Sequence, residues 1–198
     1  MIIGITGGTG CGKTTALQAI RQLGGMVIDC DAVYHRLLQT DKEMLRAIET
    51  RFPGVVDGGM LDRKKLAGIV FSQEQALRDL NAITHIAVKQ EVLRLLQDTP
   101  PLAAIDAIEL FDGNLAPLCD VTVAVTASEK DRIARLLNRD GIDRAQATAR
   151  IRAQKPEAYF RRMCDYVLEN SGTAEDFLEK CLVFFKNLTI IKERPVKE

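Results

Sequence analysis

The residues best suited to chemistry form a glycine-rich loop near the N-terminus of the 198-residue chain. Residues 7 to 14 read GGTGCGKT and fit the pattern Gly-x-x-x-x-Gly-Lys-Ser/Thr. Glycines let successive main-chain N–H groups turn inward around phosphate oxygens, the lysine reaches the β- and γ-phosphates, and the next hydroxyl ligates the bridging Mg²⁺. The pattern predicts an ATP–Mg²⁺ site with a catalytic Lys13, a metal ligand in Thr14, and nucleotide contacts from Gly8, Gly10, Cys11, Gly12, Lys13, Thr14 and Thr15.

Two aspartates could activate an acceptor hydroxyl. Asp29 and Asp31 follow the apolar run Met26 to Ile28, and residues at the carboxyl ends of strands face ligands in open α/β sheets. Either carboxylate could take the proton of an attacking alcohol near Mg²⁺. We favour Asp31 as the base and Asp29 as a metal-side or structural helper. Alternatively, one of the two only caps a helix that begins at Ala32.

A third carboxylate, Asp106, lies near the end of another apolar run. Because a buried carboxylate is costly unless it is paired, we expect Asp106 to hold Mg²⁺ through water. Arginines are dense further along the chain, at Arg132, Arg135, Arg139, Arg144, Arg150 and Arg152. Most of these side chains are expected on a solvated helix face. Arg139 and Arg150, at opposite ends of a predicted helix–loop–helix lid, are the two expected to neutralise the transferred phosphate.

The remaining candidates carry weaker signals. His85 stands on a long predicted helix without an acidic or cysteine partner at metal-ligand spacing, so its surroundings favour a structural histidine. The five cysteines are odd in number and scattered, which predicts neither a disulfide framework nor a zinc site and favours a reducing, cytoplasmic location. Cys11 is interpreted as a small filler of the loop, with a redox sensor as the alternative.

Short apolar runs alternate with helical spacing, which predicts a parallel sheet covered on both faces. The expected strands are Ile2–Thr6, Met26–Ile28, Leu102–Ile108, Val121–Val125 and Tyr166–Leu168. A helix from Thr14 to Leu23 follows the glycine loop, so the loop joins a strand to a helix. Asp143 with Gln146 resembles a capping box that opens a helix through Gln154.

The interval from Asp31 to Gln97 is expected to hold helices and no strand, the longest running from Gln73 to about Gln97. Turns are indicated at 52–54 and 57–59 by Phe-Pro-Gly and Asp-Gly-Gly. Such a helical insertion either covers the substrate or completes the core. The tail after Lys192 has the composition of a frayed end.

Composition narrows the class of partner. Lys plus Arg and Asp plus Glu are equal at 27 each, so no net positive field is available to hold nucleic acid. No apolar run approaches the ~20 residues that cross a bilayer. We expect a small-molecule enzyme that is a monomer or a weak homo-oligomer and contacts neither nucleic acid nor membrane.

Several segments of the sequence together resemble the dephospho-coenzyme A kinases. The likeness begins with the segments Gly4 to Thr15 and Val27 to Asp31, the latter followed by the basic pair His35-Arg36. It continues with segments that are similar to the family's acceptor-side helices and lid: 61–66, 70–71, 80–85, 135–141 and 149–154. Cys164-Asp165-Tyr166-Val167 before Asn170 is similar to the Ala-Asp-Tyr-Val of many members.

The resemblance implies transfer of phosphate from ATP to the ribose 3′-hydroxyl of dephospho-coenzyme A, the last step of coenzyme A synthesis. By the same resemblance Asp31 is the base, Arg63 and His85 bind the acceptor, and Arg139 is a lid arginine near ATP. Two departures are visible. The family's Pro-Leu-Leu-Phe-Glu appears as residues 108–112, Ile-Glu-Leu-Phe-Asp, and a glutamine common at the start of the lid helix is Arg132, which receives no nucleotide role.

The predicted architecture is an α/β, three-layer P-loop kinase fold with a parallel five-stranded sheet, a helical acceptor-binding insertion and a helical lid. We expect one domain, 1–198, with a core of 1–30, 100–127 and 164–190, an acceptor region of 31–99 and a lid of 128–163. The alternative function is another small-molecule or nucleoside monophosphate kinase on the same fold. A nucleotide-dependent switch without an acceptor is disfavoured, because no water-orienting pattern accompanies the loop.

Overall fold

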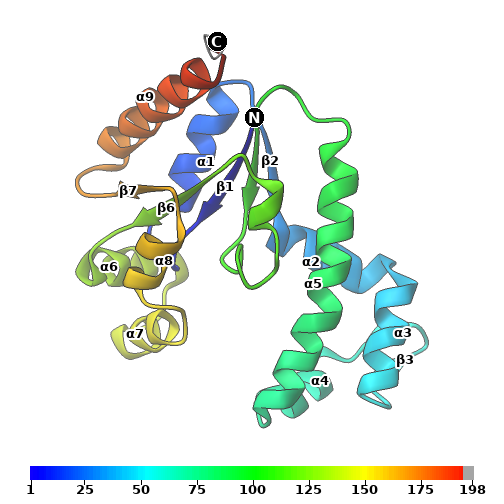
Figure 1. Ribbon diagram of the computed structural model, residues 1–198. Coiled ribbons are helices and arrows are strands. Elements are labelled where there is room, and N and C mark those ends of the chain that lie inside the picture. The colour runs from blue at the N-terminus through cyan, green and yellow to red at the C-terminus, as the bar shows by residue number, and fades with distance from the viewer. Residues whose placement is uncertain (194–198) are drawn as a thin grey trace. The chain divides into compact units, whose positions relative to one another are not determined.

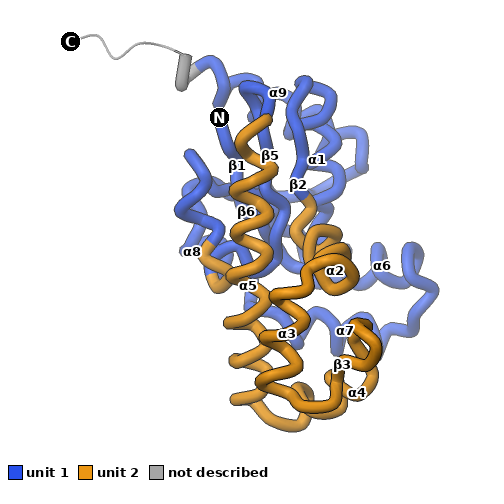
Figure 2. The backbone as a smooth tube through the Cα atoms, turned by 90° about the vertical axis from the view of Figure 1, so that its right-hand side faces the viewer, with its two compact units in different colours: residues 1–28, 99–111, 115–198 blue, residues 29–98, 112–114 orange. Residues whose placement is uncertain are grey.

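The computed structural model describes residues 1–193, with side chains through residue 190. The chain divides into two compact units, drawn in two colours in Figure 2. Unit 1 comprises residues 1–28, 99–111 and 115 onward, and unit 2 comprises residues 29–98 and 112–114. The tail that the sequence marks as frayed after Lys192 falls outside the residues whose side chains are described. Across the described residues, no helix combines the length and the apolar character that crossing a membrane requires.

Unit 1 is built on a parallel five-stranded sheet, as the sequence predicts. The strand order is β2-β5-β1-β6-β7, with β1 paired in parallel to both β5 and β6, and β6 paired in parallel to β7. The bounds are Ile2–Thr6 for β1, Met26–Asp29 for β2, Ala103–Asp106 for β5, Val121–Thr126 for β6 and Tyr166–Glu169 for β7. The third strand is therefore shorter than the predicted 102–108, and it ends at its carboxylate.

Alternation along β1 assigns its two faces to different neighbours. Ile3 and Ile5 are fully buried and pack with α1 (Lys13–Gln22) and α9 (Ala174–Glu193), which lie side by side along the sheet (Figure 1). Gly4 points the other way, where a side chain would meet Leu110 and Cys119. The segment after β5, including the short 3₁₀ helix η1 (Ala116–Leu118), thus covers the second face of β1.

Three helices between β6 and β7 form the region predicted as a lid: α6 (Glu129–Asp140), α7 (Arg144–Arg152) and α8 (Glu157–Met163). Ser128 caps α6 by accepting from the N–H of Asp131, and the capping box predicted at Asp143 and Gln146 is present at the start of α7. The two helices share a small apolar cluster of Ile133, Leu136, Ala147 and Ile151. α7 ends at Arg152, two residues before the predicted Gln154, because the segment turns toward Pro156 and α8.

Unit 2 is mostly helical. Its helices are α2 (Cys30–Thr40), α3 (Lys42–Arg51), α4 (Arg63–Val70) and α5 (Glu74–Leu96), and the first three pack against α5. Aspartates cap three of them: Asp29 accepts from Ala32 N, Asp41 from Glu43 N and Met44 N, and Asp62 from Lys65 N. α2 therefore begins at Cys30, two residues earlier than the sequence suggests.

The expectation of no strand between Asp31 and Gln97 is wrong. Residues Val56–Asp57 (β3) and Met60–Leu61 (β4) pair antiparallel as a short hairpin. Gly58 and Gly59, which the sequence marks as a turn, have φ of 56° and 83°. Two consecutive residues with positive φ give the turn whose twist matches a two-residue hairpin, and two-residue strands are too short for a visible alternation.

Candidate active site

The glycine loop joins β1 to α1 and is held open as a cradle. Gly12 precedes α1 with φ 98°, a left-handed conformation that favours glycine, and a side chain there would collide with the amide nitrogen of Asn170. No side chain of the described residues caps α1. The start of the helix therefore has no side-chain acceptor of its own, and the positive end of the helix dipole there suits an anion.

Lys13 lies against the first residue of the glycine loop. Its Nζ donates to the carbonyl oxygen of Gly7 at 2.8 Å, so the ammonium folds back over the start of the loop. A P-loop lysine reaches the β- and γ-phosphates. Such a reach would set residues 7 to 9 beside the γ-phosphate and the N-terminus of α1 beside the α- and β-phosphates.

Two polar side chains from distant segments support the back of the loop. Asn170, which follows β7, is 4% exposed and donates from Nδ2 to the carbonyl of Cys11 at 2.9 Å. Arg135 of α6 donates to the carbonyls of Gly10 at 3.2 Å and Cys11 at 3.3 Å, and to Asn170 Oδ1 at 3.0 Å. Because carbonyls that point backward leave the N–H groups on the opposite side, these bonds help to orient the cradle toward a ligand.

Two further side chains contact the loop at Thr9. Arg132 Nε donates to Thr9 O at 2.9 Å, and Thr9 N donates to Gln154 Oε1 at 2.7 Å. Sequence reasoning placed Arg132 among the arginines of a solvated face, yet its side chain is buried with 7% exposed. The spacing of Arg132 and Leu136, four residues apart on the buried face of α6, is the signal that could have identified it.

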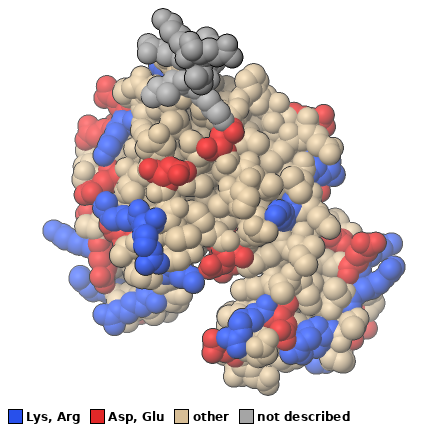
Figure 3. Space-filling view, in the orientation of Figure 1, with Lys and Arg blue, Asp and Glu red and all other residues tan. Residues whose placement is uncertain are grey.

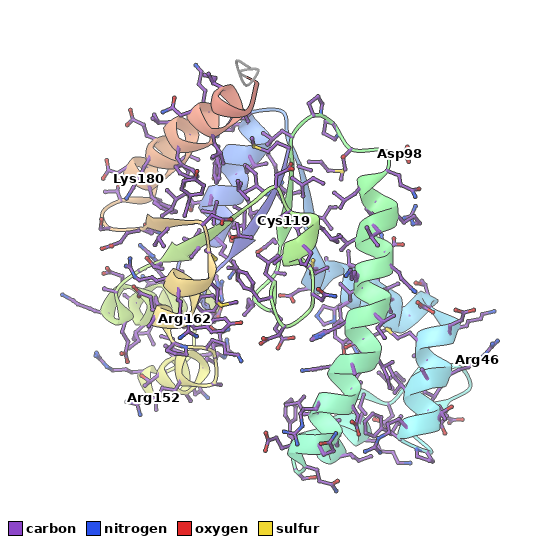
Figure 4. All side chains as sticks on the ribbon, in the orientation of Figure 1. Arg46, Asp98, Cys119, Arg152, Arg162 and Lys180 are labelled. Carbon is purple, nitrogen blue, oxygen red and sulfur yellow. The ribbon has the colours of Figure 1, made fainter. Side chains whose placement is uncertain are left out.

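Cys11 belongs to the buried core cluster. Burial raises the pKa of its thiol, an effect that Arg132 and Lys13 oppose through their positive charge. A reactive cysteine needs a lowered pKa, so this environment supports the role of a filler over that of a redox sensor. Burial also raises the pKa of the Cys119 and Cys181 thiols to about 12, and that of Cys164 to about 11. Cys119 is labelled in Figure 4.

The oxygen donors predicted for Mg²⁺ lie on neighbouring elements of unit 1. Asp106 is the last residue of β5 and is in register with Ile5, two residues before the loop begins. Thr14 is exposed in the first turn of α1. Among the described residues, no group of three His, Cys, Asp or Glu could hold a metal by itself. A hydroxyl and one carboxylate suit Mg²⁺ that arrives with phosphates and keeps several waters.

The two lid arginines chosen from the sequence meet at one carboxylate. Arg139 donates to Asp140 through Nε at 2.7 Å, and Arg150 donates to Asp140 through Nη1 at 2.8 Å. These hydrogen bonds lower the pKa of Asp140. Both arginine side chains are more than half exposed, which leaves them accessible to a ligand.

Basic side chains gather over α6, α7 and α8 (Figure 3). Arg152 extends from α7 and Arg162 from α8 (Figure 4), and both are exposed. The lid region therefore carries a positive surface beside the loop that Arg132 and Arg135 contact.

The predicted acceptor-side residues belong to unit 2. Asp31 lies in the first turn of α2 and His35 one turn later, on the same face of the helix. Arg63, the first residue of α4, lies 3.4 Å from His35 Nδ1 through its Nη2. All three side chains are exposed, with Arg63 beside His35 and Asp31 one helical turn before His35. His85 is half-buried in the middle of α5.

Asp29 has a structural task, since its carboxylate caps α2 at 2.9 Å from Ala32 N. The alternative that one of the two aspartates caps this helix is therefore correct for Asp29. Asp31 remains the carboxylate for which the structure gives no capping role.

The phosphate cradle between β1 and α1, the parallel five-stranded sheet and the helices α6 to α8 together give the fold of the P-loop kinases. The same fold occurs in the crystal structure of shikimate kinase from Bacteroides thetaiotaomicron, with a TM-score of 0.56 over 94% of this chain and 98% of that chain at 18% identity.

Sequence comparison narrows this class to one family. The dephospho-CoA kinase family profile matches residues 1–176. A dephospho-CoA kinase from Thermus thermophilus is 37% identical over 183 residues, which cover 92% of this chain and 88% of the relative. The crystal structure of TT1252 from Thermus thermophilus gives a TM-score of 0.79 at 35% identity and covers 95% of this chain and 97% of that one. The chain belongs to the dephospho-CoA kinase family.

Proposed function

We propose that this chain transfers the γ-phosphoryl group of ATP to the ribose 3′-hydroxyl of dephospho-coenzyme A, giving coenzyme A and ADP as the last step of coenzyme A synthesis. The observation that carries the proposal is the phosphate cradle braced by Asn170 and Arg135, in a chain that belongs to the dephospho-CoA kinase family. Another small-molecule kinase on this fold is not favoured, because the family match spans most of the chain.

For the nucleotide, we assign the phosphates to the main-chain N–H groups of Gly8, Gly10, Cys11 and Gly12 and to the N-terminus of α1. Lys13 then binds the β- and γ-phosphates and Thr15 an α-phosphate oxygen. The exposed start of α1 and the Lys13 ammonium over Gly7 support this assignment. As charge builds up on the departing β,γ-bridging oxygen, Lys13 stabilises it.

Mg²⁺ bound with the nucleotide neutralises phosphate charge. We propose that Thr14 ligates it through its hydroxyl and that Asp106 holds it through water. The support is the place of Asp106 at the end of β5, next to the strand that leads into the loop.

For the acceptor, we propose Asp31 as the general base. Its carboxylate takes the proton of the 3′-hydroxyl as the oxygen bonds to the γ-phosphorus and the bond to the β,γ-bridging oxygen breaks. Arg63 and His85 bind dephospho-coenzyme A, whose phosphates suit an exposed guanidinium. The exposure of Asp31 and Arg63, and the contact of Arg63 with His35 one turn after Asp31, support this assignment.

For the lid, we propose that Arg139 exchanges Asp140 for a nucleotide phosphate during the reaction, with Arg150 taking up the released carboxylate. Both arginines donate to the same residue, so one partner can leave while the other remains bound. We also propose a cytoplasmic location, because ATP is the proposed phosphate donor and the five cysteines form no disulfide.

The direct test is a coupled assay of the purified protein with ATP, Mg²⁺ and dephospho-coenzyme A, with shikimate and nucleoside monophosphates as alternative acceptors. We expect ADP release that requires dephospho-coenzyme A, and the loss of most activity in Lys13→Ala. Lys42→Ala, which removes an exposed lysine on α3, is the matched control and should keep parental turnover. Equal ADP release without any acceptor, or a preference for another acceptor, would contradict the assignment.

A further inference from the structure

Arg132 holds a buried charge that the fold leaves only partly satisfied. Its side chain is 7% exposed, and Nε donates to Thr9 O at 2.9 Å. The Nη2 atom is buried and makes no hydrogen bond with any described residue. A buried guanidinium nitrogen without an acceptor is costly, so this donor is available to an oxygen atom of a ligand that binds there.

The surroundings of Nη2 are parts of the phosphate cradle. A side chain on Gly8 would collide with Nη2 and would also come within 3.2 Å of Gln154 Oε1. Gln154 Oε1 accepts from Thr9 N at 2.7 Å, so an acceptor oxygen already occupies a position beside this part of the loop. A phosphate oxygen is an acceptor of the same kind with a negative charge, and it would suit both the amide and the guanidinium.

The position of Nη2 along the cradle indicates which phosphate of the nucleotide it would contact. Lys13 Nζ lies against Gly7 O, and Gly7, Gly8 and Thr9 are consecutive, so Arg132 stands at the γ end of the loop. The α and β phosphates belong at the opposite end, beside the N-terminus of α1. ADP would therefore leave Nη2 without a partner, and ATP would supply one.

We infer that Arg132 is a further nucleotide-binding residue, which donates from Nη2 to a γ-phosphate oxygen of ATP while Nε holds the guanidinium against Thr9 O. Gln154 releases Thr9 N as the phosphate oxygen arrives. Arg132 thus gives the protein a higher affinity for ATP than for ADP and stabilises the γ-phosphoryl charge during transfer. The inference rests on the proposed function only in its use of ATP, and not on the identity of the acceptor.

The test measures binding rather than turnover. Calorimetry with Mg²⁺ compares ADP and a β,γ-methylene analogue of ATP on the parent, on Arg132→Gln and on Arg132→Lys, with Arg144→Gln as the control because Arg144 is an exposed arginine at the start of α7. We expect both Arg132 variants to lose about tenfold or more in affinity for the analogue, and about twofold or less for ADP. Arg144→Gln should match the parent with both ligands.

An equal loss for the two nucleotides would overturn the inference, since it would mean that Arg132 only supports the loop, and so would unchanged affinity for the analogue. Arg132→Lys keeps a buried positive charge, so it provides the comparison if Arg132→Gln does not fold. A parent protein that distinguishes the analogue from ADP through Arg132 but fails to phosphorylate dephospho-coenzyme A would overturn the proposed acceptor and leave this inference intact.

Discussion

Asn170 donates a hydrogen bond from Nδ2 to the main-chain carbonyl of Cys11 at 2.9 Å. The donor follows the last strand of the sheet, and the acceptor lies in the loop after the first strand. The same carboxamide accepts from Arg135 through Oδ1 at 3.0 Å. One buried side chain therefore joins the phosphate loop to α6 and to the end of β7.

Asn170→Ala should weaken both the fold and the nucleotide site. The change leaves the Cys11 carbonyl and the Arg135 guanidinium short of a partner, at a cost of about 1–3 kcal/mol of unfolding free energy. ATP affinity should fall as the loop loses its brace. Urea unfolding and ATP titration measure the two effects, with exposed Asn138→Ala on α6 as the control. Parental ATP affinity in Asn170→Ala would show that the loop holds its shape without this bond.

Asp31→Asn should keep ATP affinity near the parental value and lower kcat by about a hundredfold or more, because an amide cannot take the proton of the acceptor. Asp29→Asn is the matched comparison. Asparagine caps helices about as well as aspartate, so α2 should be preserved and turnover should remain close to parental. Steady-state kinetics and ATP titration of both variants provide the measurement. A steep loss of kcat in Asp29→Asn with near-normal turnover in Asp31→Asn would reverse the assignment.

Asp140→Asn should lower the melting temperature slightly at neutral pH and not at all in acid. Hydrogen bonds from Arg139 and Arg150 lower the pKa of the folded carboxyl. A depressed folded pKa means stabilisation that is fully present above the ordinary carboxyl pKa of about 3.9 and is lost as pH falls through the lower folded value. The melting temperatures of parent and variant should therefore converge below about pH 4.

Thermal melts across pH 3 to 7 test this, and exposed Asp57→Asn is the control that should show no such convergence. A gap between parent and Asp140→Asn that stays constant into acid would mean that the two arginines do not stabilise the charged form.

The thiols of the folded protein should react slowly with iodoacetamide at pH 8. Burial raises the pKa of Cys119 and Cys181 to about 12 and that of Cys164 to about 11, so little thiolate is present. We expect labelling at these positions to be about a hundredfold or more slower than in urea, where the ordinary thiol pKa of about 8.5 returns. Mass spectrometry of digested samples gives the rate at each cysteine. Fast labelling of Cys181 in the folded protein would contradict its burial.

The parts of this molecule that follow from local pattern could be predicted from the sequence. The spacing of glycines, lysine and threonine from Gly7 to Thr14 is enough to predict a phosphate-binding loop. The strands of the sheet are short apolar runs between turn signals. The capping box at Asp143 is equally local. The hairpin of β3 and β4 was missed because two residues per strand show no period.

The contacts around the loop could not be predicted in the same way, because they join segments that are far apart in the chain. Gln154 and Thr9 are 145 residues apart, and Arg132 and Thr9 are 123 residues apart. A dense arginine series predicts a charged surface, and only the packing of α6 shows that Arg132 is buried while Arg139 is exposed.

The 159-residue separation between Asn170 and Cys11 also bears on how the protein is made. A nascent chain carries the glycine loop out of the ribosome well before the residue that braces it. ATP stabilises only a state that can bind it, so the braced form of the loop becomes available to the nucleotide only after residue 170 has been synthesised.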